Sequence, residues 1–234
     1  MMKKFLNLFQ NLLSLFYPRF CVACGNSLQE NETHLCLNCL LHLPETNCHL
    51  FEHHSLDDIF RGRVKVENTF ALLYYRKGGH VQQILHHLKY KRCKEVGKEL
   101  GEYYGKKLLI TGKLSNIAYI IPIPLHPKKQ KIRGYNQSEW IAMGLSNATG
   151  IPYNTKLLIR NTFTETQTKK NRYNRWENVK DVFQINDKEK LANKHVIICD
   201  DVLTTGATTE AAIQKILEVK NTKVTVITLA TANG

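Results

Sequence analysis

The sequence predicts an α/β fold in which helices flank a mostly parallel β-sheet, with a small cysteine-rich module ahead of it. From about residue 64 onward, short apolar stretches rich in β-branched residues alternate with stretches whose apolar residues recur at helical spacing. Such alternation is typical of parallel sheets whose strands are buried on both faces. Four cysteines in two close pairs precede the alternating part, within residues 21–39.

Length and composition limit the possible organisation. A chain of 234 residues accommodates one sizeable domain, or a domain of about 150–190 residues with a small module. Apolar residues make up 43% and charged residues 23%, which indicates a soluble globular protein. The formal net charge of +13 favours anionic partners such as nucleic acid, nucleotides or phosphorylated metabolites, although a solvated basic surface has the same balance.

Residues 1–17 predict an amphipathic helix. Polar residues interrupt the apolar run and no small-residue cleavage site follows, so we expect no secretory signal. The run is also shorter than the about 20 apolar residues of a membrane span. We therefore expect a cytoplasmic protein whose first helix docks on the protein itself or contacts a partner or membrane surface. The apolar residues at helical spacing are Phe5, Leu8, Phe9, Leu12, Leu13 and Phe16.

Residues 18–45 predict a zinc ribbon. Cys21 and Cys24 form one C-x2-C pair, and Cys36 and Cys39 form another after an interval of eleven residues. Each pair can turn two thiolates towards one point, and four such ligands suit tetrahedral zinc. Two disulfides are the alternative, but a reducing compartment disfavours them. Four thiolates leave no position open for water, so we expect the zinc to be structural. Residues 46–63 are predicted to be a linker.

The first elements of the main domain, predicted over residues 64–234, lie before residue 110. Residues 64–75 are rich in β-branched and aromatic residues and predict a strand. Residues 78–91 predict a helix, because apolar residues such as Ile84 and Leu88 recur at helical spacing. A second helical stretch covers residues 94–109.

The second part of the domain continues the alternation. Residues 116–125 predict a buried strand that ends at proline, and residues 134–148 predict a helix with one apolar face. The apolar stretches 195–201 and 223–230 predict two more strands, with a helix between them. This order of short apolar strands and helices predicts a parallel sheet.

The stretch "VIICDDVLTTGATT" places two acids and a glycine-threonine turn after a predicted strand. Ligands of parallel sheets bind at the carboxyl ends of strands. The helix that follows the turn begins with unpaired N–H groups and a partial positive charge, which hold phosphate. Gly206 lets the backbone come close to that phosphate. The predicted phosphate-binding residues are Val202, Leu203, Thr204, Thr205, Gly206, Ala207 and Thr208.

The two carboxylates of this stretch, Asp200 and Asp201, would repel a phosphate and must serve another part of the ligand. Carboxylates accept hydrogen bonds from the vicinal hydroxyls of a ribose. A ribose diol one sugar ring away from a 5′-phosphate fits both features, and Mg²⁺ bridging sugar and pyrophosphate oxygens would neutralise the acids. We therefore predict Asp200 and Asp201 as the catalytic residues that position the sugar. Simple capping of the helix is the alternative.

This stretch resembles the phosphoribosyl pyrophosphate (PRPP) loop of type I phosphoribosyltransferases. More narrowly, "IPIPLHPKKQKIRGYNQSEWIA" and "RNTFTETQTKKNRYNRWENV" resemble the ComF family of ComFC/GntX-like proteins. That family carries a V-P-V-P-L-H-P turn, R-G-[FY]-N-Q, T-x-x-Q-[TS] and R-x2-N before the PRPP loop, and a zinc ribbon at its N-terminus. The resemblance runs from Pro18 onward and implies the type I phosphoribosyltransferase fold. Cys199 in the strand and Trp176-Glu177 after the R-x2-N run depart from the pattern.

The resemblance also implies a loop that faces the pyrophosphate, including Pro124, Leu125 and His126. A mobile lid would follow between Pro127 and Gly134. Cations on such a lid could stabilise the charge that develops on a pyrophosphate leaving group. A solvent-facing basic loop is the alternative. The lid cations predicted at the site are Lys128, Lys129 and Arg133, with Lys131 beside them.

The run "KKNRYNRW" interleaves basic and aromatic residues. Basic side chains bind phosphates and aromatic rings can stack on unpaired bases, so single-stranded nucleic acid is a predicted partner. The aromatic residues could instead pack on the domain. The run 86–94 is also basic. The predicted nucleic-acid residues are Lys169, Lys170, Arg172, Tyr173 and Arg175.

Resemblance to the ComF family implies a PRPP-binding accessory protein of DNA uptake and natural transformation, in contact with single-stranded DNA and with competence-machinery proteins. The alternative is an active phosphoribosyltransferase that transfers ribose 5-phosphate from PRPP to a base or amine and releases pyrophosphate. A third interpretation is a regulatory sensor of PRPP or nucleotide without a DNA role. Phosphoribosyltransferases select their acceptor with a segment called the hood, and no such segment is identifiable in this sequence. This favours the accessory protein, because the fold alone does not fix the function.

Overall fold

The computed structural model describes residues 18–160 and 182–232. The predicted helix over residues 1–17 and the predicted nucleic-acid residues Lys169, Lys170, Arg172, Tyr173 and Arg175 lie outside the described residues. Within the described part of the chain, no helix is both long enough and apolar enough to cross a membrane.

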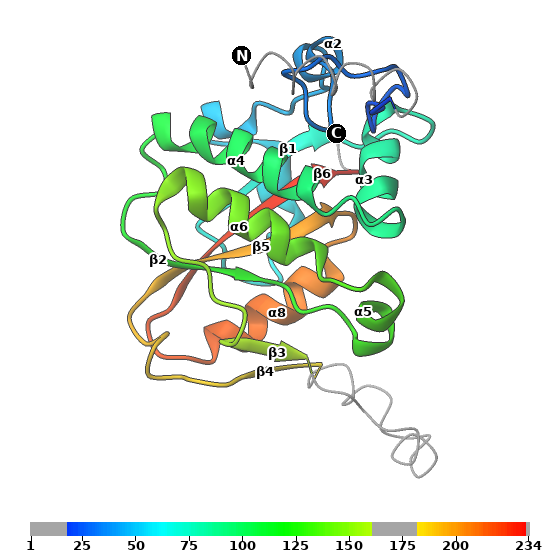
Figure 1. Cartoon of the computed structure of the whole chain (residues 1–234). Coiled ribbons are helices and arrows are strands. Elements are labelled where there is room, and N and C mark those ends of the chain that lie inside the picture. The colour runs from blue at the N-terminus through cyan, green and yellow to red at the C-terminus, as the bar shows by residue number, and fades with distance from the viewer. Residues whose placement is uncertain (1–17, 161–181, 233–234) are drawn as a thin grey trace, which may run out of the picture.

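The central sheet of the protein is parallel, as the sequence predicts. Its strand order is β1-β6-β5-β2, and every neighbouring pair runs in the same direction (Figure 1). The carboxyl ends of the strands therefore meet at one edge, with Asp200 of β5 opposite Thr228 of β6 and Cys199 opposite Pro122 of β2. The four strands are β1 (Asn68–Tyr74), β2 (Ile117–Pro122), β5 (His195–Leu203) and β6 (Lys223–Thr231).

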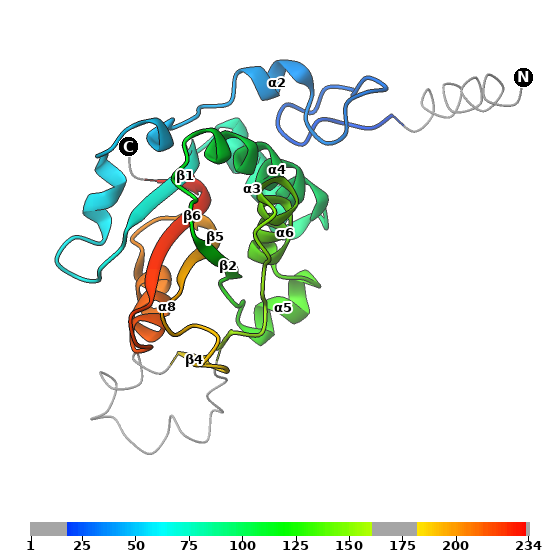
Figure 2. The ribbon, with the colours of Figure 1, turned by 90° about the vertical axis from the view of Figure 1, so that its left-hand side faces the viewer.

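Helices cover both faces of this sheet, with α3, α4 and α6 on one face and α8 on the other (Figure 2). Alternating residues of β5 divide between the two cores: Ile197 and Cys199 face the first group, and Val196 and Ile198 face α8. A strand buried on both faces must be apolar throughout, which explains its continuous apolar run. The helices are α3 (His80–Tyr90), α4 (Glu95–Ile110), α6 (Gln137–Thr149) and α8 (Ala207–Leu217).

Smaller elements lie around this core. A two-stranded antiparallel sheet joins β3 (Leu158–Arg160) to β4 (Phe183–Ile185). The short helices are α2 (Leu37–Leu41) in the cysteine module and α5 (Pro127–Arg133) after β2. The module contacts the main domain through Glu99 of α4, whose carboxylate accepts a hydrogen bond from the Thr33 hydroxyl and bonds the His34 ring.

Residues 46–63, which the sequence predicts as a linker, are instead packed against the main domain. They form two 3-10 helices, Cys48–Leu50 and Ser55–Ile59. Thr46 donates its backbone N–H to Leu72 of β1 over 2.9 Å. The side chains of Leu56 and Phe60 are buried. Because the few apolar residues here follow neither helical nor strand periodicity, the sequence pattern gives no sign of this packing.

Helices α4 and α6 cross in direct backbone contact, which glycines permit. A β-carbon at Gly101 of α4 would lie 2.5 Å from the Ile141 carbonyl oxygen of α6. A β-carbon at Gly144 of α6 would lie 2.8 Å from the Glu102 backbone nitrogen of α4. Such close approach places the N-terminus of α6, which carries Ser138, at a fixed distance from β5.

We expect Gly144→Ala to lower the free energy of unfolding by about 2 kcal/mol, since overpacking against backbone costs about 1–3 kcal/mol. Urea or thermal unfolding measures the change. Lys106→Ala, at an exposed position of α4, serves as the control and should stay within about 0.5 kcal/mol of the parent. Equal stability of the two variants would contradict the close crossing.

Candidate functional site

The two adjacent carboxylates, Asp200 and Asp201, lie near the carboxyl end of strand β5 and contact different partners. Asp201 is 8% exposed, and its Oδ2 lies 3.1 Å from Lys89 Nζ of α3. Asp200 Oδ1 accepts hydrogen bonds from the Ser138 hydroxyl and from the Asp201 backbone N–H, each at 2.8 Å. Strand β5 continues to Leu203, two residues beyond the predicted end, so these acids lie inside the strand.

The surroundings of Asp200 disfavour its charge. Burial and the neighbouring Asp201 carboxylate raise the pKa of Asp200 to about 7, against the hydrogen bonds from Ser138 and the Asp201 N–H and the charge of Lys89. Burial lowers the pKa of Arg160, while Asp200 opposes this shift. A cation or a hydroxyl donor beside Asp200 would favour the ionised carboxylate, so the pair is suited to a ligand that brings either.

The turn after β5 has the geometry of an anion site. Gly206 adopts a left-handed conformation with φ of 77° and precedes the first residue of α8. The first N–H groups of a helix lack partners within the helix, so those of α8 are available to an anion at its N-terminus. Among the predicted phosphate-binding residues, Leu203 is buried and Val202 half-buried, while Thr204, Thr205, Ala207 and Thr208 are exposed.

The packed segment 46–63 supports this turn from behind. A β-carbon at Gly206 would lie 3.1 Å from both Ile59 Cγ2 and Phe60 Cε1. Arg63 forms an ion pair of 2.8 Å with Glu210 in the first turn of α8. Glycine is therefore needed at this position for two reasons, its backbone conformation and the space beneath it.

The predicted pyrophosphate turn lies beside the carboxylates. The backbone N–H of Ile123, the first residue after β2, donates to the carbonyl of Cys199, one residue before Asp200, over 2.9 Å. The Asn136 side chain donates to the carbonyl of Ile123 over 3.0 Å and fixes the start of α6 against the same turn. The half-buried residues of this turn are Pro124, Leu125 and His126.

The basic segment that the sequence predicts as a loop is the helix α5. Proline at its first position and a left-handed Gly134 after its end explain the helix, because both are favourable at those places. The His126 ring accepts a hydrogen bond from the Lys128 backbone N–H over 3.2 Å. No residue of α5 is buried, and Lys129 is exposed. Such a helix has few contacts to hold it in one position.

Arg133 links the end of α5 to two other elements. Its guanidinium donates to the Gln137 side chain over 2.7 Å and lies 5.3 Å from the centre of the Tyr90 ring of α3. One cation of the predicted lid, Arg133, therefore lies against α3. The same helix α3 carries Lys89, which pairs with Asp201.

Lys89, Ser138 and Arg160 contribute to the site and were not among the predicted site residues. Lys89 is visible in the sequence only as part of a basic run, and Ser138 only as a residue near a helix start. Their roles depend on the crossing of α3 and α6 over β5, which local patterns do not encode. Arg160 ends β3, directly before residues that the structure does not describe.

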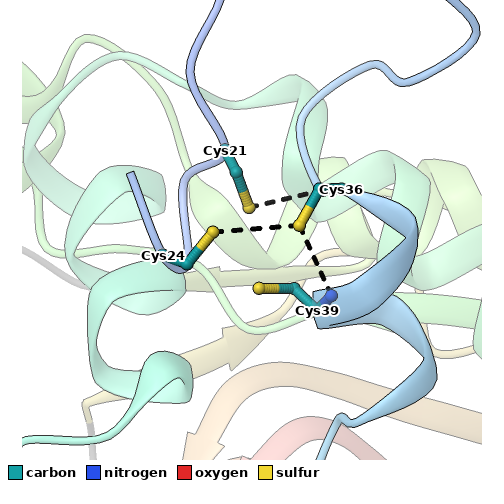
Figure 3. Close-up of side chains that lie close together, drawn as sticks. All are labelled: Cys21, Cys24, Cys36 and Cys39. Carbon is teal, nitrogen blue, oxygen red and sulfur yellow. Dashed lines mark hydrogen bonds between the residues drawn. The ribbon is translucent and has the colours of Figure 1, made fainter. Parts of the chain in front are cut away.

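The four cysteines of the N-terminal module converge on one point (Figure 3). Their sulfur atoms all lie within 4.8 Å of one another, and Cys24 and Cys36 are 3.8 Å apart. Two sulfurs at about 2.3 Å from one tetrahedral zinc are separated by about 3.8 Å. Of the second pair, Cys36 is the N-cap residue of α2 and Cys39 lies within that helix. The four thiols fit a small zinc module.

Comparison with known proteins extends these observations. The phosphoribosyl transferase domain family matches residues 137–234, which contain β5, the turn and α8. Competence protein F of Haemophilus influenzae is 28% identical over 81% of this chain and 74% of its own length. The DNA utilization protein YhgH of Escherichia coli (strain K12) is 25% identical over 88% of this chain and 87% of its own length.

A solved structure of glutamine phosphoribosylpyrophosphate amidotransferase from B. subtilis, complexed with ADP and GMP, aligns with a TM-score of 0.41 at 21% identity. The alignment covers 57% of this chain and 26% of that chain, so it spans about a quarter of the larger protein.

Elemental analysis of the purified protein should find one zinc ion per chain, because one closed set of four thiolates is present. Cys36→Ser should lose most of that zinc and unfold the module, as measured by proteolysis within residues 18–45. Cys93→Ser is the matched control and should keep the metal. Cys93 approaches His34 and Glu95, so zinc loss from this control would place the metal there and not among the four sulfurs.

Proposed function

We propose that this chain, a homologue of Competence protein F and YhgH with a phosphoribosyl transferase domain, binds PRPP or a related phosphoribosyl ligand and acts in DNA uptake. In this role it is a cytoplasmic accessory protein that contacts single-stranded DNA and other proteins of the competence machinery. The observation that carries the proposal is the arrangement at the end of β5, where two carboxylates precede an exposed turn at the N-terminus of α8.

The ligand that fits this arrangement has hydroxyls at one end and phosphate at the other. Asp200 and Asp201 would accept hydrogen bonds from the ribose hydroxyls. Thr204, Thr205 and Thr208 would donate hydroxyl groups, and the first N–H groups of α8 would bind the 5′-phosphate. Their exposure supports this assignment.

The pyrophosphate of such a ligand would lie towards β2. The half-buried turn after β2 is joined to β5 by the hydrogen bond between Ile123 and Cys199. Arg160 interacts electrostatically with Asp200, and the exposed lysines of α5 lie beyond the turn. These cations are suited to a leaving group that gains negative charge. Closure of α5 would bring Lys128, Lys129 and Arg133 towards it.

Mg²⁺ would accompany the ligand. Carboxylate oxygens suit Mg²⁺. Burial and, after it, the Asp201 carboxylate raise the pKa of Asp200, and a cation beside this carboxyl would favour its ionised form. Asp200 and Asp201 are the residues that would hold the ion or its water molecules. The ion would supply charge neutralisation between the sugar and the pyrophosphate.

Two features support the DNA role. The net charge of +13 favours an anionic partner, and the names of the relatives refer to competence and DNA utilization. The zinc module would give a second contact surface, and the basic run at Lys169, Lys170, Arg172, Tyr173 and Arg175 the nucleic-acid contact.

The second candidate function is catalysis of phosphoribosyl transfer. The same residues would position the sugar while a base or amine displaces pyrophosphate. Pyrophosphate release in the presence of PRPP, Mg²⁺ and a panel of bases discriminates between the two. Release above the PRPP-only rate would favour the enzyme, and its absence would favour the accessory protein.

PRPP binding, measured by calorimetry with Mg²⁺, should strengthen with pH. Asp200 is mostly protonated about one unit below its pKa of about 7 and mostly ionised one unit above it. Because the ionised form accepts the sugar hydroxyls, the affinity should rise about tenfold between about pH 6 and pH 8. Asp200→Asn, which resembles the neutral acid, should bind PRPP weakly at both pH values. Any pH dependence that remains in this variant comes from other groups, such as the phosphates of the ligand.

Asp58→Asn serves as the matched control for this experiment, since Asp58 forms an exposed pair with Arg61. It should keep both the affinity and the pH dependence of the parent protein. Binding of PRPP by Asp200→Asn with parental affinity and an unchanged pH profile would contradict the role of the carboxylate.

The logarithm of the association constant for a fluorescent single-stranded oligonucleotide should fall linearly with the logarithm of the salt concentration. Replacing Lys169, Lys170 and Arg172 by alanine should lower the affinity and reduce the salt slope by about one for each phosphate that is no longer bound. The charge-matched control replaces the exposed Lys188, Lys190 and Lys194 and should change little. An equal decrease of affinity in both triple variants would indicate diffuse attraction and refute the assigned nucleic-acid contact.

A further inference from the structure

A second group of metal-ligand side chains lies where the cysteine module meets the main domain. One ring nitrogen of His34, the Cys93 sulfur and a Glu95 carboxylate oxygen all lie within 4.8 Å of one another. His34 belongs to the module, two residues before Cys36. Cys93 lies in the short connection between α3 and α4, and Glu95 is the first residue of α4. The group is separate from the four cysteines and joins two parts of the chain that are far apart in the sequence.

The His34 ring is held in the tautomer that a metal ligand needs. Its Nδ1 lies 2.7 Å from Glu99 Oε2, and an ionised carboxylate can only accept, so Nδ1 carries the proton and donates it. The other ring nitrogen, Nε2, then has a free lone pair for a metal. The same Glu99 oxygen accepts the Thr33 hydroxyl over 2.5 Å, which fixes the carboxylate in turn. Metal-binding histidines usually donate their second ring N–H to such a carboxylate.

Both sides of this junction present their ligands from ordered backbone. The His34 carbonyl accepts the Val22 backbone N–H over 2.9 Å, which ties His34 to the first cysteine pair. On the other side, Cys93 is half-buried and packs against the core beneath α3 and α4. The next residue, Lys94, places its ammonium 4.4 Å from the centre of the Trp140 ring of α6. His34 and Cys93 are therefore held in place before any ion binds.

The three side chains suit a divalent ion of the zinc class. Bonds of about 2.3 Å to sulfur and about 2.0–2.2 Å to nitrogen and oxygen place the ligand atoms of a tetrahedral ion about 3.3–3.8 Å apart. Separations of up to 4.8 Å can be closed by rotation of the exposed Glu95 side chain. One thiolate and one carboxylate would neutralise the ion. Mg²⁺ is disfavoured, because thiolate and imidazole are softer ligands than the oxygens that it takes.

We propose that His34, Cys93 and Glu95 bind a second divalent metal ion of the zinc class, and that this ion clamps the cysteine module to α4. Three protein ligands leave a fourth position for water or an anionic group. The ion is held less tightly than one among four thiolates, since a single thiolate is present and Glu95 is exposed. Purified protein therefore keeps the first ion only, and the second has to be added. The inference does not depend on the proposed PRPP site.

The test adds Co²⁺ to full-length protein that has been dialysed against a weak chelator and retains one zinc ion per chain. Co²⁺ takes the same ligands as Zn²⁺, and its bond to a thiolate gives a charge-transfer absorption band. We expect one Co²⁺ to bind per chain with this band, while elemental analysis still finds the first zinc. Calorimetry with Zn²⁺ should likewise show one added ion per chain.

Substitutions identify the ligands of the added ion. Cys93→Ser should abolish the charge-transfer band and keep the first zinc. Glu99→Gln should weaken Co²⁺ binding about 10- to 100-fold and keep the band, because Glu99 orients His34 without touching the metal. His34→Ala and Glu95→Gln each remove a ligand and should weaken binding at least as much. His42→Ala, which removes an exposed histidine of the same module, is the matched control and should leave binding unchanged.

The clamp has a readout of its own. Added Zn²⁺ should slow amide hydrogen exchange on both sides of the junction, at residues 33–35 of the module and at residues 93–97 around the start of α4. Cys93→Ser should show no such change. Slower exchange on one side only would contradict the clamp.

Three results would overturn the metal site itself. One is the absence of Co²⁺ and Zn²⁺ binding beyond the first zinc. Another is Co²⁺ binding without the charge-transfer band, or binding that His34→Ala and Glu95→Gln leave unchanged, since the ion would then occupy another part of the surface. The third is a band that persists in Cys93→Ser or appears as the first zinc is lost, which would place cobalt among the four cysteines.

Discussion

The structure depends on placing two neighbouring carboxylates inside the last part of a strand that is otherwise apolar. Asp201 is compensated by Lys89 of α3, and Asp200 by the Ser138 hydroxyl of α6. Removing the Lys89 amine would leave the buried Asp201 carboxylate without its cation, which is costly. Removing the Ser138 hydroxyl would take one hydrogen bond from Asp200. The helices that carry Lys89 and Ser138 must therefore be held at defined positions relative to β5, and the glycine contact between α4 and α6 holds α6 there. The raised pKa of Asp200, due to burial and to Asp201, shows that the compensation is incomplete.

The incomplete compensation of Asp200 and Asp201 is the physical reason why we propose a ligand at this place in the fold. Buried like charges stay tolerable when a cation or hydroxyl donors arrive, so the site favours a ligand that brings them. The turn beside the acids has the opposite character, because Gly206 and the first turn of α8 offer donors. Residues 46–63 keep the turn in place from below through Ile59, Phe60 and Arg63. The ligand that we propose, with hydroxyls and phosphate separated by one sugar, would satisfy both parts.

Most of the fold follows from the sequence because buried parallel strands are continuous apolar runs, as in β5, and because apolar spacing marks α3 and α6. The position of the acids and the turn between a strand and a helix was predictable because they are adjacent in the chain, and their role in binding a ligand stays a prediction. Lys89, Ser138 and Arg160 were not, since only the crossing of distant elements brings them to Asp200 and Asp201. The packing of residues 46–63 was missed because Leu56 and Phe60 stand in a polar stretch without periodicity. The helical form of α5 was missed although its proline and Gly134 were favourable signals.

The most direct test of the central claim is a crystal structure of the protein with Mg²⁺ and PRPP. The account predicts that the ribose hydroxyls lie within hydrogen-bonding distance of the Asp200 and Asp201 carboxylates and that the 5′-phosphate contacts the backbone around Gly206. A ligand bound elsewhere would contradict it. So would a ligand in this region that leaves both carboxylates bonded only to Ser138 and Lys89.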